Sequence, residues 1–103
     1  MKIEAITVCV NYSDFLAATL PINRRQFDRL IVVTDAKDLH THDVSARDNV
    51  FTLAIRLCEA GTGVFSKAVA INHAIDKYPG GADWLCILDA DVALPFNFHG
   101  TIE

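Results

Sequence analysis

The sequence predicts an α/β fold in which a mostly parallel sheet has flanking helices. Four apolar runs, at residues 2–10, 29–35, 50–55 and 83–91, have the length and the bounding turn residues that are typical of strands. The segments between them are polar or have helical spacing, and strands that alternate with helices favour a parallel sheet. The chain has 103 residues, of which 51% are hydrophobic and 21% are charged. We therefore expect residues 1–103 to form one small domain.

The chain begins with a strand and continues into a helix. Residues 2–10 alternate between apolar and polar side chains and end in a continuous apolar run. Ser13 or Asp14 can cap a helix that includes the apolar residues 15–20. We expect Pro21 to end or kink this helix, because proline cannot donate a backbone hydrogen bond.

The next strand, at residues 29–35, is the most continuous β-branched apolar run in the chain. Such a run predicts a central strand that is covered on both faces. A polar connection with a second helical turn, at residues 23–28, precedes it. Residues 36–49 are polar with weak helical spacing, and a shorter strand follows at residues 50–55.

The last helix is expected at residues 64–78, after a loop at residues 56–63. Residues 79–81, Pro-Gly-Gly, end it. The apolar residues that predict its buried face by helical spacing are Val64, Ala68, Ile71 and Ile75.

Two carboxylates stand where the fourth apolar run ends. Asp89 and Asp91 are two positions apart, and side chains alternate along a strand, so we expect both on the same side of the fourth strand. Two carboxylates at the end of a buried strand lose hydration and repel each other, which a cation relieves. Their oxygen atoms suit a hard divalent ion such as Mg²⁺ or Mn²⁺. The alternative is that both residues only end the strand and form a turn.

Polar residues follow three of the four expected strands. Asn11, Asp35 and Asp89 stand at their carboxyl ends. In open parallel sheets, ligands bind outside the carboxyl ends of the strands. The sequence therefore predicts a ligand site at this edge of the sheet.

Three blocks occur in a fixed order: IVVTD at 31–35, FSKAVAINHAI at 65–75 and WLCILDADVALP at 84–95. Together they resemble the N-terminal half of a GT-A glycosyltransferase, closest to family 2 and galactosyltransferase-like enzymes, including versions found in phages. The resemblance covers nearly the whole chain. It implies a Rossmann-like sheet that forms the nucleotide-binding half of that fold.

The resemblance also implies a nucleotide-sugar donor, with a UDP-sugar favoured. By this likeness Val10, Asn11 and Tyr12 would line the base, and Asp35 would hydrogen-bond the base or the ribose.

The remaining donor contacts would lie nearer the phosphates. The resemblance places Lys67 and Asn72 against the diphosphate or the sugar. Asp89 would contact the ribose or the metal, and Asp91 would bind the metal, Mn²⁺ or Mg²⁺, directly.

The chain departs from the family pattern in two respects. A GT-A domain is roughly twice this length, and its acceptor half, with the general base of inverting members and often a third metal ligand, would follow residue 94. Ser66 and Ala68 also stand where members often have Asn and Gly. We therefore expect a truncated donor-binding half-domain that would be a hexosyltransferase only when completed. His99 could supply a third ligand.

A second hypothesis is a non-catalytic assembly module that retains the fold. A half-length sheet would leave the fourth strand at an edge, with unpaired backbone groups. This predicts a homo-oligomer or a partner strand at that edge.

Other motifs are weaker. Residues 61–67 have two glycines and a lysine but lack the Gly-Lys-Ser/Thr of a phosphate loop. Residues 88–92 fit the nucleophile motif of haloacid-dehalogenase-like phosphatases, in which the first Asp attacks phosphate, but the lysine and aspartates that this fold requires downstream are missing. His40 and His42 lie in a polar segment and predict a solvated loop or helix face.

Composition excludes several classes of function. The net charge of −4 argues against a broad nucleic-acid surface. No apolar run reaches the roughly 18 residues of a membrane span. The three cysteines, Cys9, Cys58 and Cys86, match no zinc pattern, and we expect them reduced in a cytoplasmic protein.

Overall fold

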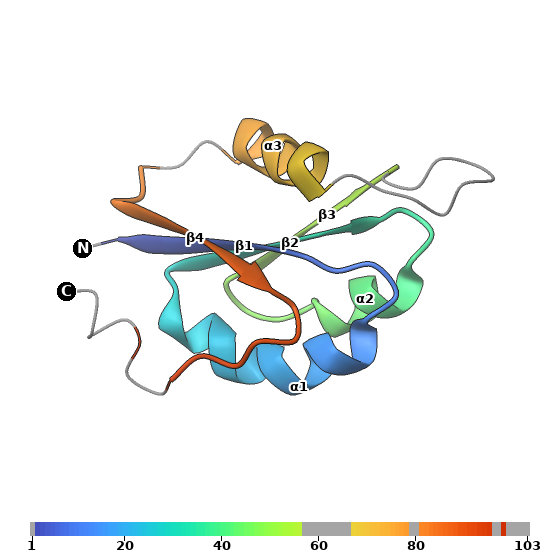
Figure 1. The fold of residues 1–103 in the computed structure, drawn as a ribbon, viewed down its shortest axis with the longest axis horizontal. Coiled ribbons are helices and arrows are strands. Elements are labelled where there is room, and N and C mark those ends of the chain that lie inside the picture. The colour runs from blue at the N-terminus through green and yellow to red at the C-terminus, as the bar shows by residue number, and fades with distance from the viewer. Residues whose placement is uncertain (1, 57–66, 79–80, 96–97, 99–103) are drawn as a thin grey trace.

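The computed structural model describes residues 2–56, 67–78, 81–95 and 98. It contains a four-stranded, all-parallel sheet with the strand order β3-β2-β1-β4, flanked by helices (Figure 1). This confirms the predicted fold class. The elements are β1 (Ile3–Val8), α1 (Ser13–Asn23), a 3₁₀ turn η1 (Arg24–Gln26), β2 (Arg29–Asp35), α2 (Leu39–Val44), β3 (Val50–Ile55), α3 (Lys67–Lys77) and β4 (Trp84–Asp89).

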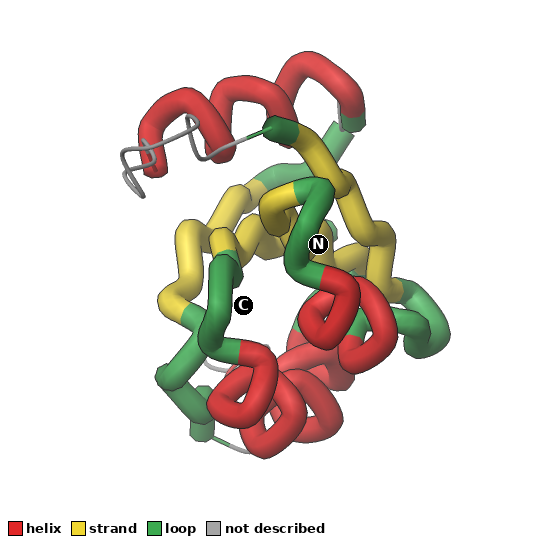
Figure 2. The backbone as a smooth tube through the Cα atoms, turned by 90° about the vertical axis from the view of Figure 1, so that its right-hand side faces the viewer, coloured by secondary structure: helices red, strands yellow, loops and turns green. Residues whose placement is uncertain are grey.

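The helices form layers on both faces of the sheet. Helices α1 and α2 cover one face and α3 covers the other, so the sheet is the middle layer (Figures 1 and 2). The strand order explains this arrangement, because β1 is followed outward by β2 and β3 on one side, whereas β4 lies on its other side. Parallel connections are almost always right-handed, so reversing the direction of travel moves the connecting helix to the opposite face.

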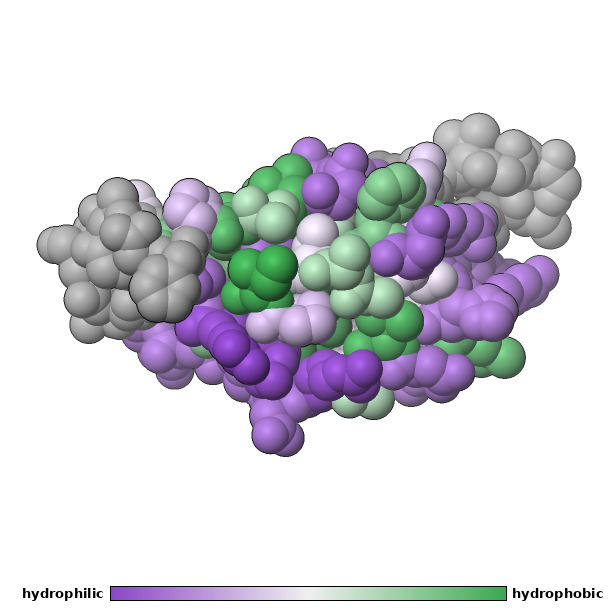
Figure 3. Space-filling model, turned by 90° about the horizontal axis from the view of Figure 1, so that it is seen from below, coloured by the Kyte–Doolittle hydropathy of each residue, from purple (hydrophilic) through white to green (hydrophobic). Residues whose placement is uncertain are grey.

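The core has two parts that the sheet separates. Alternate residues of β2 contribute to each: Leu30 and Val32 face α1, whereas Ile31 and Val33 face α3. All four side chains are at most 2% exposed, which confirms the predicted central, doubly covered strand. The solvent side of α1 and α2 mixes polar and apolar side chains (Figure 3).

The fourth strand lies at the edge of the sheet, as the second hypothesis expected, but it is largely exposed rather than buried. It ends at Asp89, and Asp91 lies in the following turn. The alternation of side chains along a strand therefore cannot be used to put the two carboxylates on the same side. The apolar run predicted the strand, but its place in the sheet depends on which strands pair.

Helix α1 begins and ends differently from the prediction. Neither Ser13 nor Asp14 caps it, since Tyr12 is the N-cap residue and makes no side-chain capping bond. Pro21 does not end the helix either, because helical structure continues to Asn23 and then tightens into η1. Near a helix end, the loss of one backbone donor can be accommodated, which explains why the chain continues past Pro21.

The buried face of helix α3 is only partly the one predicted. Ala70 and Ala74 are fully buried against β1 and β2, and the predicted Ile71 is partly buried beside them, whereas Ala68 and Ile75 are exposed. The two alanines are four positions apart and their small side chains permit close approach to the sheet. Residues 64–66 of the predicted helix lie outside the described residues.

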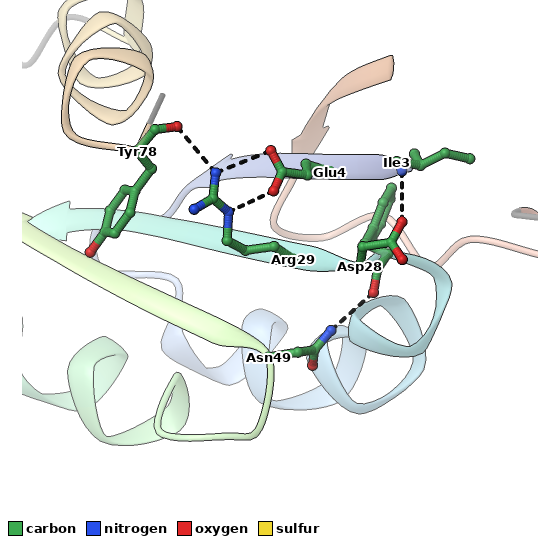
Figure 4. Close-up of polar contacts among 7 residues, drawn as sticks. Ile3, Glu4, Asp28, Arg29, Asn49 and Tyr78 are labelled. Atoms are coloured by element: carbon green, nitrogen blue, oxygen red, sulfur yellow. Dashed lines mark hydrogen bonds and ion pairs between the residues drawn. The ribbon is translucent and has the colours of Figure 1, made fainter. Parts of the chain in front are cut away.

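A buried ion pair connects the strand starts to the end of α3 (Figure 4). Arg29 at the start of β2 lies 2.7 Å from Glu4 of β1 through its Nε, and it donates to the carbonyl of Tyr78 at 3.1 Å. The Glu4 side chain is only 5% exposed and that of Arg29 21% exposed. The guanidinium also lies 5.7 Å from the ring of Phe51 and 5.4 Å from that of Tyr78. Arg29 therefore joins three elements at the end of the sheet opposite the strand carboxyl ends.

We expect Arg29→Met to lower the free energy of unfolding by about 3 kcal/mol, because it leaves the buried Glu4 carboxylate without its counter-charge. Urea denaturation monitored by circular dichroism measures this. The exposed Arg25→Met is the matched control, with an expected change within about 0.5 kcal/mol. Adding Glu4→Gln to Arg29→Met should recover part of the loss, and equal losses for Arg29→Met and the control would contradict the role assigned to the pair.

Candidate functional site

A pocket of about 310 Å³ opens at the carboxyl ends of β1 and β4. Its lining residues are Val8, Tyr12, Phe15, Asp89, Ala90 and Asp91. These two strands are neighbours in the sheet. From β1 the chain continues to β2 on one side of β1, whereas β4 pairs with β1 on its other side. Loops at such a switch point diverge and leave a crevice, which is where open α/β sheets bind ligands. The pocket therefore lies where the topology predicts one.

One wall of the pocket is aromatic. Tyr12 directly precedes α1 and Phe15 lies in its first turn, with ring centroids 5.9 Å apart. The two residues are 58% and 49% exposed. Large apolar side chains usually lose water on folding, so a paired, exposed set at a pocket favours contact with a planar or apolar ligand group.

A second part of the lining, the acidic wall, consists of Asp89 and Asp91, and side chains of α1 hold the turn that follows Asp89. Thr19 donates to the carbonyl of Ala90 at 2.6 Å, and Asn23 donates to the carbonyl of Val92 at 2.6 Å. Asn23 also accepts from the amide of Leu94 at 2.8 Å. These buried side chains fix the backbone of the turn that contains Asp91. Asp89 and Asp91 thus both line the pocket, and both are exposed.

The loop after β1 depends on Asp38. Asn11 has a φ of 62°, and its amide donates to Asp38 Oδ2 at 2.7 Å. Asp38 is 8% exposed; it also accepts from the amide and hydroxyl of Thr41, and so caps α2. Burial alone would raise the pKa of Asp38, but the bonds from Thr41 and from the Asn11 amide outweigh it and lower the pKa. Asp38 therefore fixes the backbone that leads to Tyr12.

Lys67 reaches the acidic wall from the other face of the sheet. It is the first residue of α3, and its Nζ lies 2.5 Å from Oδ1 of Asp89. Both side chains are exposed, at 50% and 60%. The structure therefore brings together Tyr12, Lys67, Asp89 and Asp91 from the residues that the sequence singled out.

The other predicted residues lie elsewhere. Val10 is 5% exposed and packs in the core on the α3 side. Asp35 is buried at the end of β2 and accepts from the amide of Lys37 at 2.9 Å. Asn72 is exposed on α3, and neither it nor Asn11 lines the pocket.

Sequence reasoning missed Phe15, Asp38, Thr19 and Asn23. A signal existed for Asp38, because an aspartate three positions before a threonine is a capping pattern for a short helix. Thr19 and Asn23 are four positions apart on α1 and so share one face. Their partners are 71 and 69 residues away in the chain, which no local pattern indicates.

The carboxylates of the pocket are the candidate ligands for a metal ion. Asp89 and Asp91 offer hard oxygen ligands, and among the described residues no group of three or more His, Cys, Asp or Glu side chains could hold a metal. A closed protein cage is therefore not formed by this part of the chain. Two carboxylates at an open pocket do fit Mg²⁺ or Mn²⁺, which keep waters and take further ligands from substrate phosphates. His99, the predicted third ligand, lies outside the described residues.

Cys9, Cys86 and the histidines of α2 lie outside this pocket. Burial raises the pKa of Cys9 and of Cys86, and both thiols are free. A raised pKa leaves little thiolate on Cys9, which is buried, or on Cys86, which is partly buried. Cys58 lies outside the described residues. His40 and His42 are exposed on α2, as predicted. Most of the glycine-containing segment 61–67 is not described.

No protein-family model matches the chain, and no curated protein matches it. Within the described ranges, no helix has the length and apolarity needed to cross a membrane.

We expect Asp38→Asn to lower the free energy of unfolding at neutral pH, because an amide cannot replace a carboxylate that accepts from Asn11 and Thr41. A group whose folded-state pKa is lowered stabilises the fold fully above its unfolded value, about 3.9 for Asp. The difference between wild type and variant should therefore be constant from pH 7 to about 5 and shrink as the pH falls through and below 4.

Urea titrations across this pH range measure the effect. Asp43→Asn on the same helix is the control, because Asp43 is exposed. A difference between wild type and Asp38→Asn that persists undiminished at pH 3 would contradict the assignment.

Proposed function

We propose that this chain is a nucleotide-sugar-binding domain of the GT-A glycosyltransferase type that uses a divalent metal. The observation that supports this most is the pocket at the β1–β4 switch point, whose lining combines two aromatic rings with two carboxylates. A nucleoside diphosphate has complementary parts: a planar base for the aromatic wall and charged phosphates for the acidic wall once a cation is present. A UDP-sugar is the favoured ligand, by the resemblance described above.

In this proposal each wall has its own task. Tyr12 and Phe15 would stack on the base, since stacking on aromatic side chains is tolerant and strong. Asp91 would hold Mn²⁺ or Mg²⁺ with Asp89, and the ion, when bound, neutralises the diphosphate leaving group. Thr19 and Asn23 would keep the Asp91 turn in place, and Asp38 would keep Asn11 and Tyr12 in place, so that neither wall reorganises on binding.

The metal-dependent affinity for UDP is the direct test. Titrating UDP into the protein by calorimetry, with Mn²⁺ and then with EDTA, should show binding only with the metal. We expect Asp91→Asn to weaken this binding at least about tenfold, because even outer partners of metal ligands contribute about 10- to 100-fold to metal affinity.

Asp76→Asn is the matched control, because Asp76 is an exposed aspartate near the other end of α3. The control should bind UDP as the wild type does. Equal affinity of the Asp91→Asn variant and wild type would remove the metal site from the proposal. Binding that is unchanged by EDTA would remove the metal altogether.

A second candidate function is an assembly module, and the exposure of β4 favours it. In the sheet of the described residues β4 is an outer strand, and Trp84, Leu85 and Ile87 are 58%, 46% and 46% exposed. An apolar outer strand with unpaired backbone groups is a template for another strand. The partner would be a second copy or a strand of another protein.

If β4 mediates self-association, the wild type should form dimers or larger species as its concentration rises. We expect Ile87→Lys to shift the population to monomers, because a charge on an outer strand opposes edge-to-edge pairing. Sedimentation velocity at several concentrations measures this. The control is Ile22→Lys, since Ile22 is similarly exposed at 46% but lies on α1. A wild type that stays monomeric throughout would count against this candidate.

A further inference from the structure

We propose that Lys67 is an internal counter-ion that occupies the acidic wall when no metal is bound and moves to the phosphates of the ligand when metal binds. This inference rests on the proposed function and concerns how its site is regulated. The observation behind it is that the Lys67 ammonium contacts Asp89, one of the two carboxylates assigned to the metal, at 2.5 Å.

The contact makes Lys67 and a metal ion competitors for the same carboxylate. Nζ of Lys67 lies against Oδ1 of Asp89, and Asp89 is one of the two carboxylates that would hold the ion. An ammonium and a divalent ion at one carboxylate repel each other. We therefore expect metal binding to displace Lys67 from Asp89.

The geometry makes that departure easy. Both partners are at least half exposed, and the strength of such exposed pairs is low because water screens them. Lys67 is the first residue of α3, and its four-carbon side chain can change its position without moving the helix. The ion pair is thus weak enough to yield to a divalent ion.

The released ammonium has a second use in the same place. It belongs to the first turn of α3, where the helix dipole favours anions. A diphosphate bound to the metal at Asp89 and Asp91 would lie beside it. In this proposal the Lys67 ammonium exchanges its contact with the Asp89 carboxylate for a contact with a ligand phosphate. The metal and the nucleotide should therefore each increase the affinity of the site for the other.

The neutral variant Lys67→Met separates the two effects. Without nucleotide, removing the competitor should strengthen Mn²⁺ binding, by about two- to fivefold, which is the range that exposed ion pairs span. With UDP, removing the phosphate partner should weaken binding, so the factor by which UDP strengthens Mn²⁺ binding should fall. Lys77→Met is the control at the other end of α3, with both affinities unchanged.

Mn²⁺ affinity is measured by electron paramagnetic resonance of the free ion, with and without UDP, so the readout is independent of any catalytic activity. Opposite changes in the two conditions support the proposal. Unchanged or weaker Mn²⁺ binding by Lys67→Met in the absence of UDP overturns it, and the proposed function stands if the wild type still binds UDP in an Asp91-dependent manner. If neither protein binds Mn²⁺, both proposals fail.

Discussion

The pairing of β1 with neighbours on both sides is the constraint on which the rest of the structure depends. β1 pairs in parallel with β2 through residues 4–8 and with β4 through residues 3–8. Because parallel neighbours need crossover connections of consistent hand, this one placement sends α1 and α2 to one face and α3 to the other. It also separates the loops after β1 and β4, and that separation creates the pocket between Tyr12 and Asp91.

Both ends of the sheet are fastened by charged or polar side chains, but in different ways. At the strand starts, Glu4 and Arg29 form a bidentate ion pair beneath α3, largely shielded from water. At the carboxyl ends, Asp38 accepts hydrogen bonds from backbone and hydroxyl groups, whereas Asp89 forms a solvent-exposed ion pair with Lys67. The first two arrangements are buried and rigid, and the third is exposed and exchangeable. A site that must admit a ligand is expected at the exchangeable end.

The sequence allowed all four strands and their parallel arrangement to be predicted, because apolar runs and their spacing are local properties. It also indicated Tyr12, Lys67, Asp89 and Asp91, which the structure brings to one pocket edge. The errors have a common cause. The exposure of β4, the buried alanine face of α3 and the continuation of α1 past Pro21 are set by tertiary packing rather than by periodicity. The anchors Thr19 and Asn23 act across about 70 residues of chain, beyond the reach of any local pattern.

Those two anchors have a consequence for how the acidic turn can vary. Thr19 and Asn23 bind main-chain atoms of residues 90–94, and the side chains of Asp91, Val92 and Ala93 are exposed. The path of the turn is therefore specified by these bonds and by the packing of Ala90 and Leu94 on the core, not by the side chain at position 91. Divergent evolution or directed mutagenesis could exchange the carboxylate at position 91 for a side chain with different chemistry while the loop retained its shape. The backbone geometry of this turn can therefore be inherited independently of the chemistry that it presents.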